Sequence, residues 1–353
     1  MGRPGVGIWG AGWVAGGHLT AYLAQGDCRV VAIGSRRQES ARALAERFKL
    51  DCPLYTEYSA FLAHPGLDVV SICTPHHSHP SNTIEAARAG KHIFVEKPIA
   101  LTLGDLYSMR DAVRRAGVRT AVGFVVRWTP LAMRLHQMIR EGALGQVFLM
   151  DVDYWHTRRG RPEPYRRRAT GGSALLLGGC HAIDAAQFLL GADPVEVTAR
   201  SVQVAGPPED AYEFDCVEAC LVRYSNGAVG RISAVVKGHI PYQFNIDILG
   251  SHGTVRNNRV FLQGDSEAGG FRQLPEPGPD SGDVAHHPFG GLIRHFLDCV
   301  ARGQDSTVSV ENAVLTHELC FAALLSERTG ATVRLPLGEA DQRSIHKLLA
   351  ESS

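Results

Sequence analysis

The first part of the chain alternates short apolar runs with segments of helical periodicity. Most of the runs are apolar at nearly every position, which is typical of parallel strands covered on both faces; they cover Val6–Trp9, Val30–Ile33, Val69–Cys73, His92–Val95 and Thr120–Val122. Helices are expected between them over Ala41–Phe48 and Thr83–Ala89, the second ended by Gly90. A capping box from Thr102 to Asp105 predicts the start of another helix. The alternation predicts an α/β fold with a doubly wound parallel sheet.

After Gly123 the rhythm changes to a few helices and many strands. Helices are expected over Pro130–Glu141 and about Ser173–Leu190, with a strand over Val147–Tyr154 between them. The apolar positions of Tyr242–Ile248 alternate with Gln243, Asn245 and Asp247, which predicts a sheet with one apolar and one polar face. Asn226-Gly227 between two strand-like runs predicts a hairpin. Closing helices are expected over Phe289–Arg302 and Val310–Thr329.

These patterns predict two domains and a tail. Residues 1–123 would form the nucleotide-binding type of domain called a Rossmann fold, and residues 124–338 an α+β domain with a mainly antiparallel open sheet. Residues 339–353 are expected to form a polar tail, and Gly264–Asp283 a surface loop.

Composition narrows the function classes. The chain has 353 residues with 36 Lys and Arg against 36 Asp and Glu, so no overall charge favours nucleic acid or an anionic membrane as a partner. The eight cysteines contain no C-x-x-C pair, which is typical of a reducing compartment. The first strand follows the N-terminus directly, and Leu175–Gly191 is too short to span a bilayer. We therefore expect a soluble, cytoplasmic protein.

The first strand runs into a glycine turn with the sequence Gly10-Ala11-Gly12-Trp13-Val14-Ala15. In this G-x-G-x-x-A pattern Gly10 allows the tight turn and Gly12 lets the backbone approach a pyrophosphate. Ala15 keeps the following helix close to the sheet, and the N–H groups at the helix N-terminus face the phosphates. The turn predicts a dinucleotide site that includes Trp13 and Val14.

The end of the second strand bears on which dinucleotide binds. An acid usually holds the ribose 2′-hydroxyl there, but this chain has Ser35-Arg36-Arg37. A Ser hydroxyl and an Arg guanidinium suit a 2′-phosphate, so NADP is predicted in preference to NAD. The alternative is that Arg36 stacks on adenine and both cofactors bind.

Two further motifs stand at carboxyl ends of strands, where an open parallel sheet places ligands. Thr74, Pro75 and His79 follow the third of these strands, in a stretch with His76 and His77, and Glu96-Lys97-Pro98 follows the next. No Cys or acid completes a metal-ligand set at the usual spacing, so no metal is expected. The proline fixes the chain beyond the strand and presents Lys97 near the nicotinamide.

These motifs, with Gly171-Gly172 followed by His181 and Asp184, resemble the glucose–fructose oxidoreductase/inositol dehydrogenase (Gfo/Idh/MocA) family from Val6 to about Pro336. The resemblance implies a nicotinamide cofactor, a sugar, cyclitol or related alcohol as substrate, and an open sheet that forms a homodimer or homotetramer.

The resemblance also implies residue roles. Glu96 would touch the nicotinamide ribose, Lys97 would contact the reacting oxygen, and His181 would transfer the proton. Gly123-Phe124 and Arg127 would line the cleft between the domains.

One position departs from the family pattern. Many relatives carry Asp four residues before the histidine, whereas this chain has Leu177. Asp184 can reach the same helical face as His181 and replace that carboxylate, or it can make a structural bond within its own domain.

An arginine-rich segment lies just before Gly171. It reads WHTRRGRPEPYRRRAT from Trp155 to Thr170, and Trp155, Arg158 and Arg168 are its candidate substrate contacts. Arginines and aromatics can hold a carboxylate or phosphate or stack on a sugar ring. The alternative is a solvated loop or a subunit contact. One short loop in a neutral protein does not indicate nucleic-acid binding.

The sequence thus predicts an NAD(P)-dependent oxidoreductase that moves a hydride between nicotinamide and a carbinol carbon of a sugar, sugar acid or cyclitol, with Lys97 and His181 assisting proton transfer. Two alternatives remain: a redox-neutral enzyme that retains its cofactor, such as one that cleaves glycosides by transient oxidation, and a non-catalytic cofactor-sensing protein.

Overall fold

The computed structural model describes residues 3–156, 163–266, 269–278 and 287–351. It divides into two compact units, each made of two stretches of chain. Unit 1 comprises Met1–Val125 and His287–Val314, and unit 2 comprises Val126–His286 and Leu315–Ser353.

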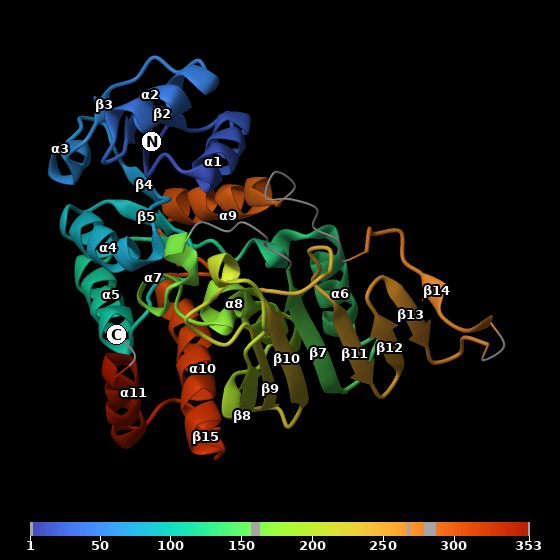
Figure 1. The fold of residues 1–353 in the computed structure, drawn as a ribbon. Helices are drawn as coiled ribbons and strands as arrows, with labels where there is room; N and C mark the ends of the chain where they lie inside the picture. Colours follow the sequence, from blue (N-terminus) through green and yellow to red (C-terminus); the bar gives the residue numbers. More distant parts are fainter. Residues whose placement is uncertain (1–2, 157–162, 267–268, 279–286, 352–353) are drawn as a thin grey trace. The chain divides into compact units, whose positions relative to one another are not determined.

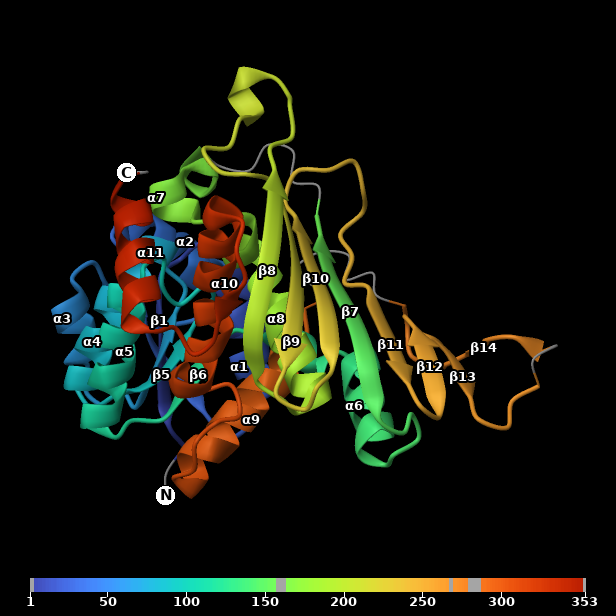
Figure 2. The ribbon, with the colours of Figure 1, turned by 90° about the horizontal axis from the view of Figure 1, so that it is seen from below.

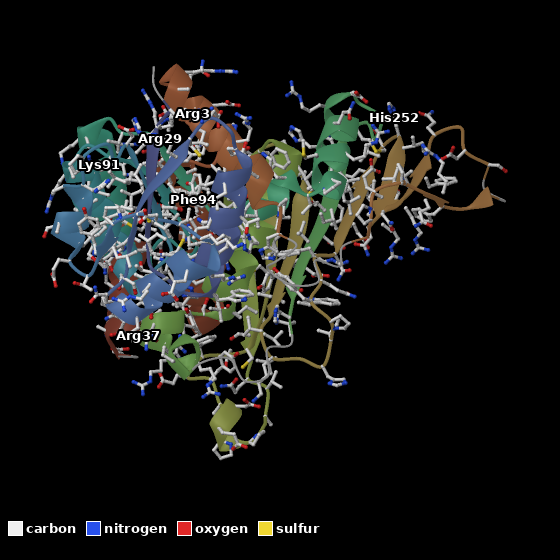
Figure 3. The ribbon with its side chains drawn as sticks, turned by 90° about the horizontal axis from the view of Figure 1, so that it is seen from above. Arg3, Arg29, Arg37, Lys91, Phe94 and His252 are labelled. Atoms are coloured by element: carbon white, nitrogen blue, oxygen red, sulfur yellow. The ribbon has the colours of Figure 1, made fainter. Side chains whose placement is uncertain are left out.

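Unit 1 is built on a six-stranded parallel sheet in the order β3-β2-β1-β4-β5-β6 (Figure 1). Its strands are β1 (Gly5–Trp9), β2 (Arg29–Gly34), β3 (Leu54–Tyr55), β4 (Val69–Ile72), β5 (His92–Val95) and β6 (Thr120–Val122). All residues of β1 and β4 are buried, because helices flank the sheet. Phe94 of β5 lies among the side chains of this unit, whereas Arg37 lies exposed at its rim (Figure 3). The predicted doubly wound sheet is confirmed.

The helices of unit 1 show the end signals that the sequence indicates at two of their ends. They are α1 (Trp13–Ala24), α2 (Gln38–Arg47), α3 (Tyr58–Leu62), α4 (His79–Arg88), α5 (Leu103–Ala116) and α9 (Phe289–Arg302). The Thr102 hydroxyl accepts a 3.1 Å hydrogen bond from the Asp105 N–H, so the capping box starts α5 as predicted. Gly90 has φ +70° just beyond α4, which only glycine adopts readily.

The segment 287–314 joins unit 1, although the sequence places it within a continuous domain over residues 124–338. Val122 of β6 donates its N–H to the Val308 carbonyl at 2.8 Å. The Val310 N–H donates to the Thr120 hydroxyl at 2.9 Å. Phe289 of α9 packs against His18 of α1, with 4.7 Å between ring centroids. This segment therefore covers the β6 edge and packs on α1, contacts between distant residues that local periodicity does not encode.

Unit 2 contains a nine-stranded sheet in the order β14-β13-β12-β11-β7-β10-β9-β8-β15, which Figure 1 shows from β8 to β14. The strands are β7 (Val147–Trp155), β8 (Pro194–Val202), β9 (Val217–Tyr224), β10 (Val229–Val235), β11 (Ile246–Gly250), β12 (Gly253–Arg256), β13 (Arg259–Leu262), β14 (Arg272–Gln273) and β15 (Val333–Arg334). All neighbours pair antiparallel except β7 and β10. The hairpin turn between β9 and β10 has Gly227 at φ +86°, as Asn-Gly predicts. The mainly antiparallel sheet is confirmed.

Buried and exposed positions alternate along the central strands of this sheet. On β7, Met150, Val152 and Tyr154 are buried, whereas the residues between them are partly exposed. The predicted alternation around residue 244 is confirmed, although β11 begins only at Ile246. The other face carries polar pairs, such as Arg231 Nε to Asp151 Oδ1 at 2.7 Å. Leu221, 55% exposed, lies among these polar side chains.

The helices of unit 2 are α6 (Pro130–Arg140), α7 (Arg168–Gly171), α8 (Cys180–Leu190), α11 (Glu339–Glu351) and most of α10 (Val310–Thr329). A π-helical turn, Leu175–Gly179, leads directly into α8. Figure 2 shows α8 and α10 beside strands β8–β10. The buried face of the sheet packs against α8 and the π-helical turn.

Two expectations need correction. Residues 339–351 form α11 with a fully buried Ile345, so the predicted polar tail is wrong for this stretch. From the sequence alone, Leu175–Gly191 is expected to be too short to span a bilayer. Within the described residues, however, the longer helical segment Arg168–Leu190 is long and apolar enough to do so by length and composition. Because 83% of its apolar window is buried inside the protein, it has the character of a core helix.

Candidate active site

The glycine turn of unit 1 has the geometry of a phosphate-binding turn. Gly10 has φ +103°, and a Cβ there would lie 2.5 Å from the Cys73 carbonyl oxygen, so only glycine fits. Gly12 is the N-cap of α1, and no side chain caps this helix or places an acid in its first turn. The uncapped N–H groups and the positive end of the helix dipole therefore suit a pyrophosphate. These residues fit the dinucleotide that the sequence predicts.

The other predicted cofactor contacts lie around the same sheet edge. Trp13 begins α1 with 55% of its surface exposed, Val14 is half-buried and Ala15 is fully buried against the sheet. Ser35 directly follows β2 and is half-buried, and the next residue, Arg36, is exposed. This part of the chain therefore offers no carboxylate directly after β2.

Glu96, directly after β5, is a buried carboxylate with a histidine partner. Its Oε1 lies 2.9 Å from Nε2 of His18, a fully buried residue of α1. His18 Nδ1 lies 2.7 Å from the hydroxyl of Ser71 on β4. Glu96 Oε2 accepts a 3.3 Å hydrogen bond from the N–H of Lys97. One ion pair thus joins the phosphate-binding helix to the loop that carries Lys97.

The charges of this pair stabilise each other. Burial lowers the pKa of His18, but Cys73 and the Glu96 carboxylate outweigh burial and raise it to about 10. Burial raises the pKa of Glu96, but the bond and charge of His18, with Lys97 and His79, lower it below the usual value. At neutral pH the pair is therefore an imidazolium and a carboxylate.

The backbone also closes on Glu96 from β6. A Cβ at Gly123 would lie 2.6 Å from Glu96 Oε1, so the chain passes the carboxylate where only glycine fits. Lys97 is half-buried beside this carboxylate. Glu96 is thus bonded within the protein, and the roles predicted for Glu96 and Lys97 toward cofactor and substrate stay predictions.

His79, a predicted cofactor contact, is bonded to two loops of unit 1. Its side chain is fully buried, and its two ring nitrogens each lie 2.8 Å from a backbone carbonyl, one of Pro98 and one of Thr74. The Thr74 hydroxyl bonds to Asn82 at 3.0 Å, and Pro75 is the residue before a short 3₁₀ turn. These contacts make His79 a link between two loops, and a cofactor contact of this residue stays a prediction.

In unit 2, His181 lies in the first turn of α8 among aromatic rings. It is 1% exposed, and its ring centroid lies 6.1 Å from that of Tyr154 and 5.8 Å from that of Phe244. Tyr242 and His156 complete the cluster, with 4.6 Å between their centroids. The preceding π-helical turn is a wide turn of the kind found at functional sites.

Glu218 of β9 holds the start of that turn. It is buried and accepts a hydrogen bond from the Leu175 N–H. The packed rings and this bond fix the segment that carries His181. Leu177, at the position of the usual Asp, is itself buried.

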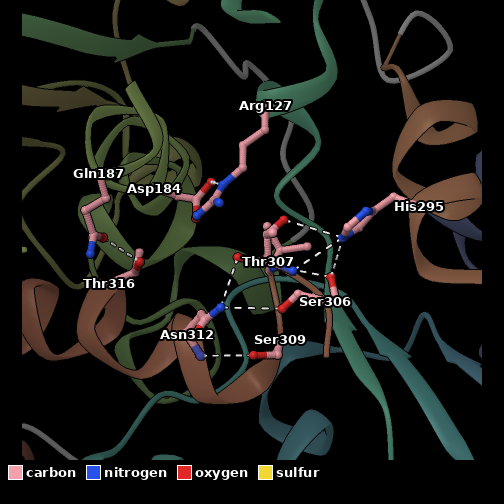
Figure 4. Close-up of polar contacts among 10 residues, drawn as sticks. Arg127, Asp184, Gln187, His295, Ser306, Thr307, Ser309, Asn312 and Thr316 are labelled. Carbon is pink, nitrogen blue, oxygen red and sulfur yellow. Dashed lines mark hydrogen bonds and ion pairs between the residues drawn. The ribbon is translucent and has the colours of Figure 1, made fainter. Parts of the chain in front are cut away.

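Asp184 is bonded to Arg127 rather than placed to replace that Asp. Arg127 donates from Nη2 and Nε to the two carboxylate oxygens at 2.6 and 2.7 Å, and both side chains are largely buried (Figure 4). The guanidinium also lies over the Phe188 ring at 5.2 Å. Figure 4 further shows Gln187 of α8 bonded to Thr316 of α10 at 2.7 Å. The contacts favour the structural role for Asp184, and cofactor or substrate binding by Arg127 stays a prediction.

Trp155 and the arginine-rich segment are bonded to the protein where they are described. The Trp155 indole N–H donates to Ser233 at 2.7 Å, on the partly exposed side of β7 opposite Tyr154. Arg168 binds Glu213 through its backbone and side chain, and Arg166 donates to the Glu209 carbonyl. Arg158, a further candidate, lies outside the described residues, as do Arg159 and Arg161.

Some site residues escaped the sequence reasoning although a signal was present. His18 is a polar residue on the apolar face of α1, in line with Ala15, Leu19 and Tyr22. Tyr154 continues the buried alternation of β7, which would have favoured it over Trp155. Glu218 is likewise a polar residue in a buried series.

Comparison with known proteins finds a matching family model for a large part of each unit. The model of an oxidoreductase family with an NAD-binding Rossmann fold matches residues 5–124, and that of a GFO/IDH/MocA C-terminal domain matches residues 132–256. Scyllo-inositol 2-dehydrogenase (NAD(+)) of Bacillus subtilis (strain 168) is 26% identical, with 88% of this chain and 90% of that protein covered. Inositol 2-dehydrogenase of Rhizobium meliloti (strain 1021) is 31% identical, with 70% and 74% covered.

The solved structures agree with these matches. A levoglucosan dehydrogenase in complex with NADH and L-sorbose has a TM-score of 0.85 and 26% identity to this chain. The match covers 96% of this chain and all of that one.

The raised pKa of His18 predicts a pH-dependent stability. A histidine whose pKa rises from 6.5 to about 10 on folding contributes stability that is complete below pH 6.5 and lost as pH rises through 10. The advantage of the wild type over His18→Gln should therefore shrink between pH 7 and pH 10, by up to about 4 kcal/mol. Urea unfolding of both proteins across this range measures it.

His92→Gln is the matched control for this experiment. Burial, with Arg119 adding to it, lowers the pKa of His92. Any stability linked to His92 is thus lost toward low pH, and its substitution should leave the trend between pH 7 and 10 unchanged. An advantage of the wild type over His18→Gln that stays constant up to pH 10 would show that His18 is neutral.

Proposed function

The chain belongs to the GFO/IDH/MocA oxidoreductase family, and we propose that it oxidises a carbinol group of a neutral cyclitol or sugar with a nicotinamide cofactor, or carries out the reverse reduction. The observation that carries the proposal is that unit 1 keeps both an uncapped phosphate-binding turn and a lysine two residues after β5, next to the buried Glu96. A protein that only senses the cofactor needs the first feature and not the second.

Different residues would bind the cofactor, stabilise charge on the substrate and transfer the proton. Gly10, Gly12 and the N-terminus of α1 would hold the pyrophosphate of the dinucleotide, which when bound supplies the hydride acceptor or donor. Lys97 stabilises negative charge on the substrate oxygen as the hydroxyl loses its proton. His181 takes that proton from the hydroxyl and returns it in the reduction. The aromatic rings around His181 fix its orientation.

A neutral substrate is favoured over a sugar acid or sugar phosphate. Arg166 and Arg168, two described arginines of the candidate clamp, bind Glu209, Asp210 and Glu213 of the protein. A substrate anion would have to displace these partners. The proteins to which the chain is similar include dehydrogenases named for inositol, levoglucosan and apiose.

NADP is proposed in preference to NAD. The support is the Ser35-Arg36-Arg37 stretch after β2, where a carboxylate would repel a 2′-phosphate. The alternative is NAD, the cofactor named for the scyllo-inositol 2-dehydrogenase (NAD(+)) of Bacillus subtilis.

His181→Gln tests the proton-transfer role. The amide cannot act as a base, so kcat should fall about a hundredfold or more while cofactor affinity stays within twofold. Initial rates at 340 nm with myo-inositol, scyllo-inositol and levoglucosan, and cofactor titration by fluorescence, measure both.

Lys97→Met tests the role of the lysine cation, and Asp184→Asn tests the structural role of Asp184. Lys97→Met should lower kcat to a similar extent, because a substrate oxygen that gains charge loses its cation. Near-normal turnover in His181→Gln with none in Lys97→Met would assign the proton transfer to Lys97 instead.

Asp184→Asn should mainly lower thermal stability, since Asp184 bonds to Arg127.

Arg36→Ala tests the cofactor preference. If Arg36 binds a 2′-phosphate, the variant should bind NADP about ten- to a hundredfold more weakly and NAD with little change. Arg42→Ala, an exposed arginine in the adjacent helix α2, is the control. An equal loss for both cofactors would indicate that Arg36 stacks on adenine.

The partly exposed face of the nine-stranded sheet is proposed to bind a second copy of the chain. That face combines the exposed Leu221 with polar pairs such as Arg231–Asp151, a mixture suited to a hydrogen-bonded interface. Light scattering at micromolar concentration should give a dimer or tetramer, and Leu221→Glu should shift it toward the monomer. Leu23→Glu, on α1, is the control, and a monomeric wild type would rule the proposal out.

A further inference from the structure

His79 is the first residue of α4 and has two acceptors but no donor as ring partners. Its Nδ1 lies 2.8 Å from the carbonyl oxygen of Pro98, and its Nε2 lies 2.8 Å from that of Thr74. The side chain is fully buried, so water does not reach the ring from outside. Thr74 follows β4 and Pro98 follows β5, so one imidazole spans the two loops.

The chemistry of the partners defines the protonation state. A backbone carbonyl oxygen only accepts hydrogen bonds, so each ring nitrogen must donate one. A neutral imidazole has a single N–H, and its second nitrogen would turn a lone pair toward a carbonyl oxygen at 2.8 Å. Only the imidazolium, with an N–H at both positions, satisfies both carbonyls.

The charged and titratable groups around the ring include some that raise and some that lower the pKa of His79. Burial, with the nearby His77 adding to it, lowers the pKa of His79 below its usual value and outweighs the two carbonyl bonds and the Glu96 carboxylate, which raise it. The His76 ring lies 5.7 Å from the His79 ring. Although burial has the largest effect of these, a neutral ring would leave a buried carbonyl without its donor, a loss that favours the charged form.

We propose that His79 is a positioning residue, held as an imidazolium, that ties the loop after β4 to the loop after β5 and so fixes the backbone on the C-terminal side of Lys97. His18 fixes the other side through Glu96. Lys97 is then held between two buried histidines that never contact the substrate. The charge state is independent of the proposed function, whereas the catalytic consequence rests on it.

Nitrogen NMR of the cofactor-free, ¹⁵N-labelled enzyme tests the charge state directly. Both ring nitrogens of His79 should have the shifts of N–H-bearing nitrogens at pH 7 and pH 8, and the signals should be absent in His79→Gln. His18 can give similar signals, so the spectrum of His18→Gln separates the two. If one nitrogen of His79 lacks a proton at pH 7, the proposal is wrong. The same sample in urea provides the unfolded reference.

Kinetics tests the positioning role. His79→Gln can reach only one of the two carbonyls, so kcat should fall at least tenfold with little change in the KM for the cyclitol, because Lys97 is misplaced rather than removed. His77→Gln, which changes an exposed histidine of the same segment, should keep kcat within twofold. Should His79→Gln not fold, the wild-type and His18→Gln spectra still decide the charge state.

The outcomes separate the two proposals. An imidazolium in the spectra with unchanged kcat in His79→Gln would contradict the positioning role. An imidazolium in a wild type that oxidises no cyclitol or sugar with either cofactor would contradict the proposed function and leave the charge state of His79 intact.

Discussion

The arrangement of unit 1 depends on the buried carboxylate of Glu96, which needs partners that compensate its charge. Ionised Glu96 is stable inside the protein only because His18 provides a positive charge at 2.9 Å and the Lys97 N–H a further hydrogen bond. Meeting this requirement brings α1, β5 and the start of the Lys97 loop together, while Ser71 fixes the far side of the imidazole from β4. The chain after β6 passes so close to the Glu96 carboxylate that only glycine fits at position 123.

That arrangement couples two tasks of a dinucleotide enzyme. The helix whose N-terminus suits a pyrophosphate is the same helix that carries His18 on its buried face. A displacement of α1 would therefore disturb Glu96 and, through it, the backbone of Lys97. Unit 2 fixes its own candidate, His181, by other means: packed rings, the bond from Leu175 to Glu218, and the Arg127–Asp184 pair that holds α8.

The sequence indicated most of the elements and the polar residues that follow the strands. The bounds of β5, β6, α9 and α10 agree with the predictions. The two strands are short, almost continuous apolar runs, and α9 has apolar positions at helical spacing and Gly303 just beyond its last residue. The association of α9 with unit 1 was missed because it rests on pairings between distant residues, such as Thr120 with Val310. Helix α11 was missed because its polar sequence contains a single fully buried residue, Ile345.

The sequence indicates the candidate site residues but not the bonds between them. Motifs at strand ends located Gly10, Glu96 and Lys97, but the pair between His18 and Glu96 joins positions 78 residues apart, which one sequence does not reveal. The two bonds of His79 could not be predicted either, because only the fold shows which backbone carbonyls face its ring.

The central claim is that a hydride moves from a carbinol carbon of the substrate to the nicotinamide. The most direct test uses a cyclitol or sugar from the active panel with deuterium on its carbinol carbons, incubated with oxidised cofactor, followed by mass spectrometry of the released dinucleotide. The account predicts reduced cofactor that carries one deuterium per molecule, in amounts equal to the ketone formed. A product formed without release of reduced cofactor, with the deuterium returned to the sugar, would contradict it.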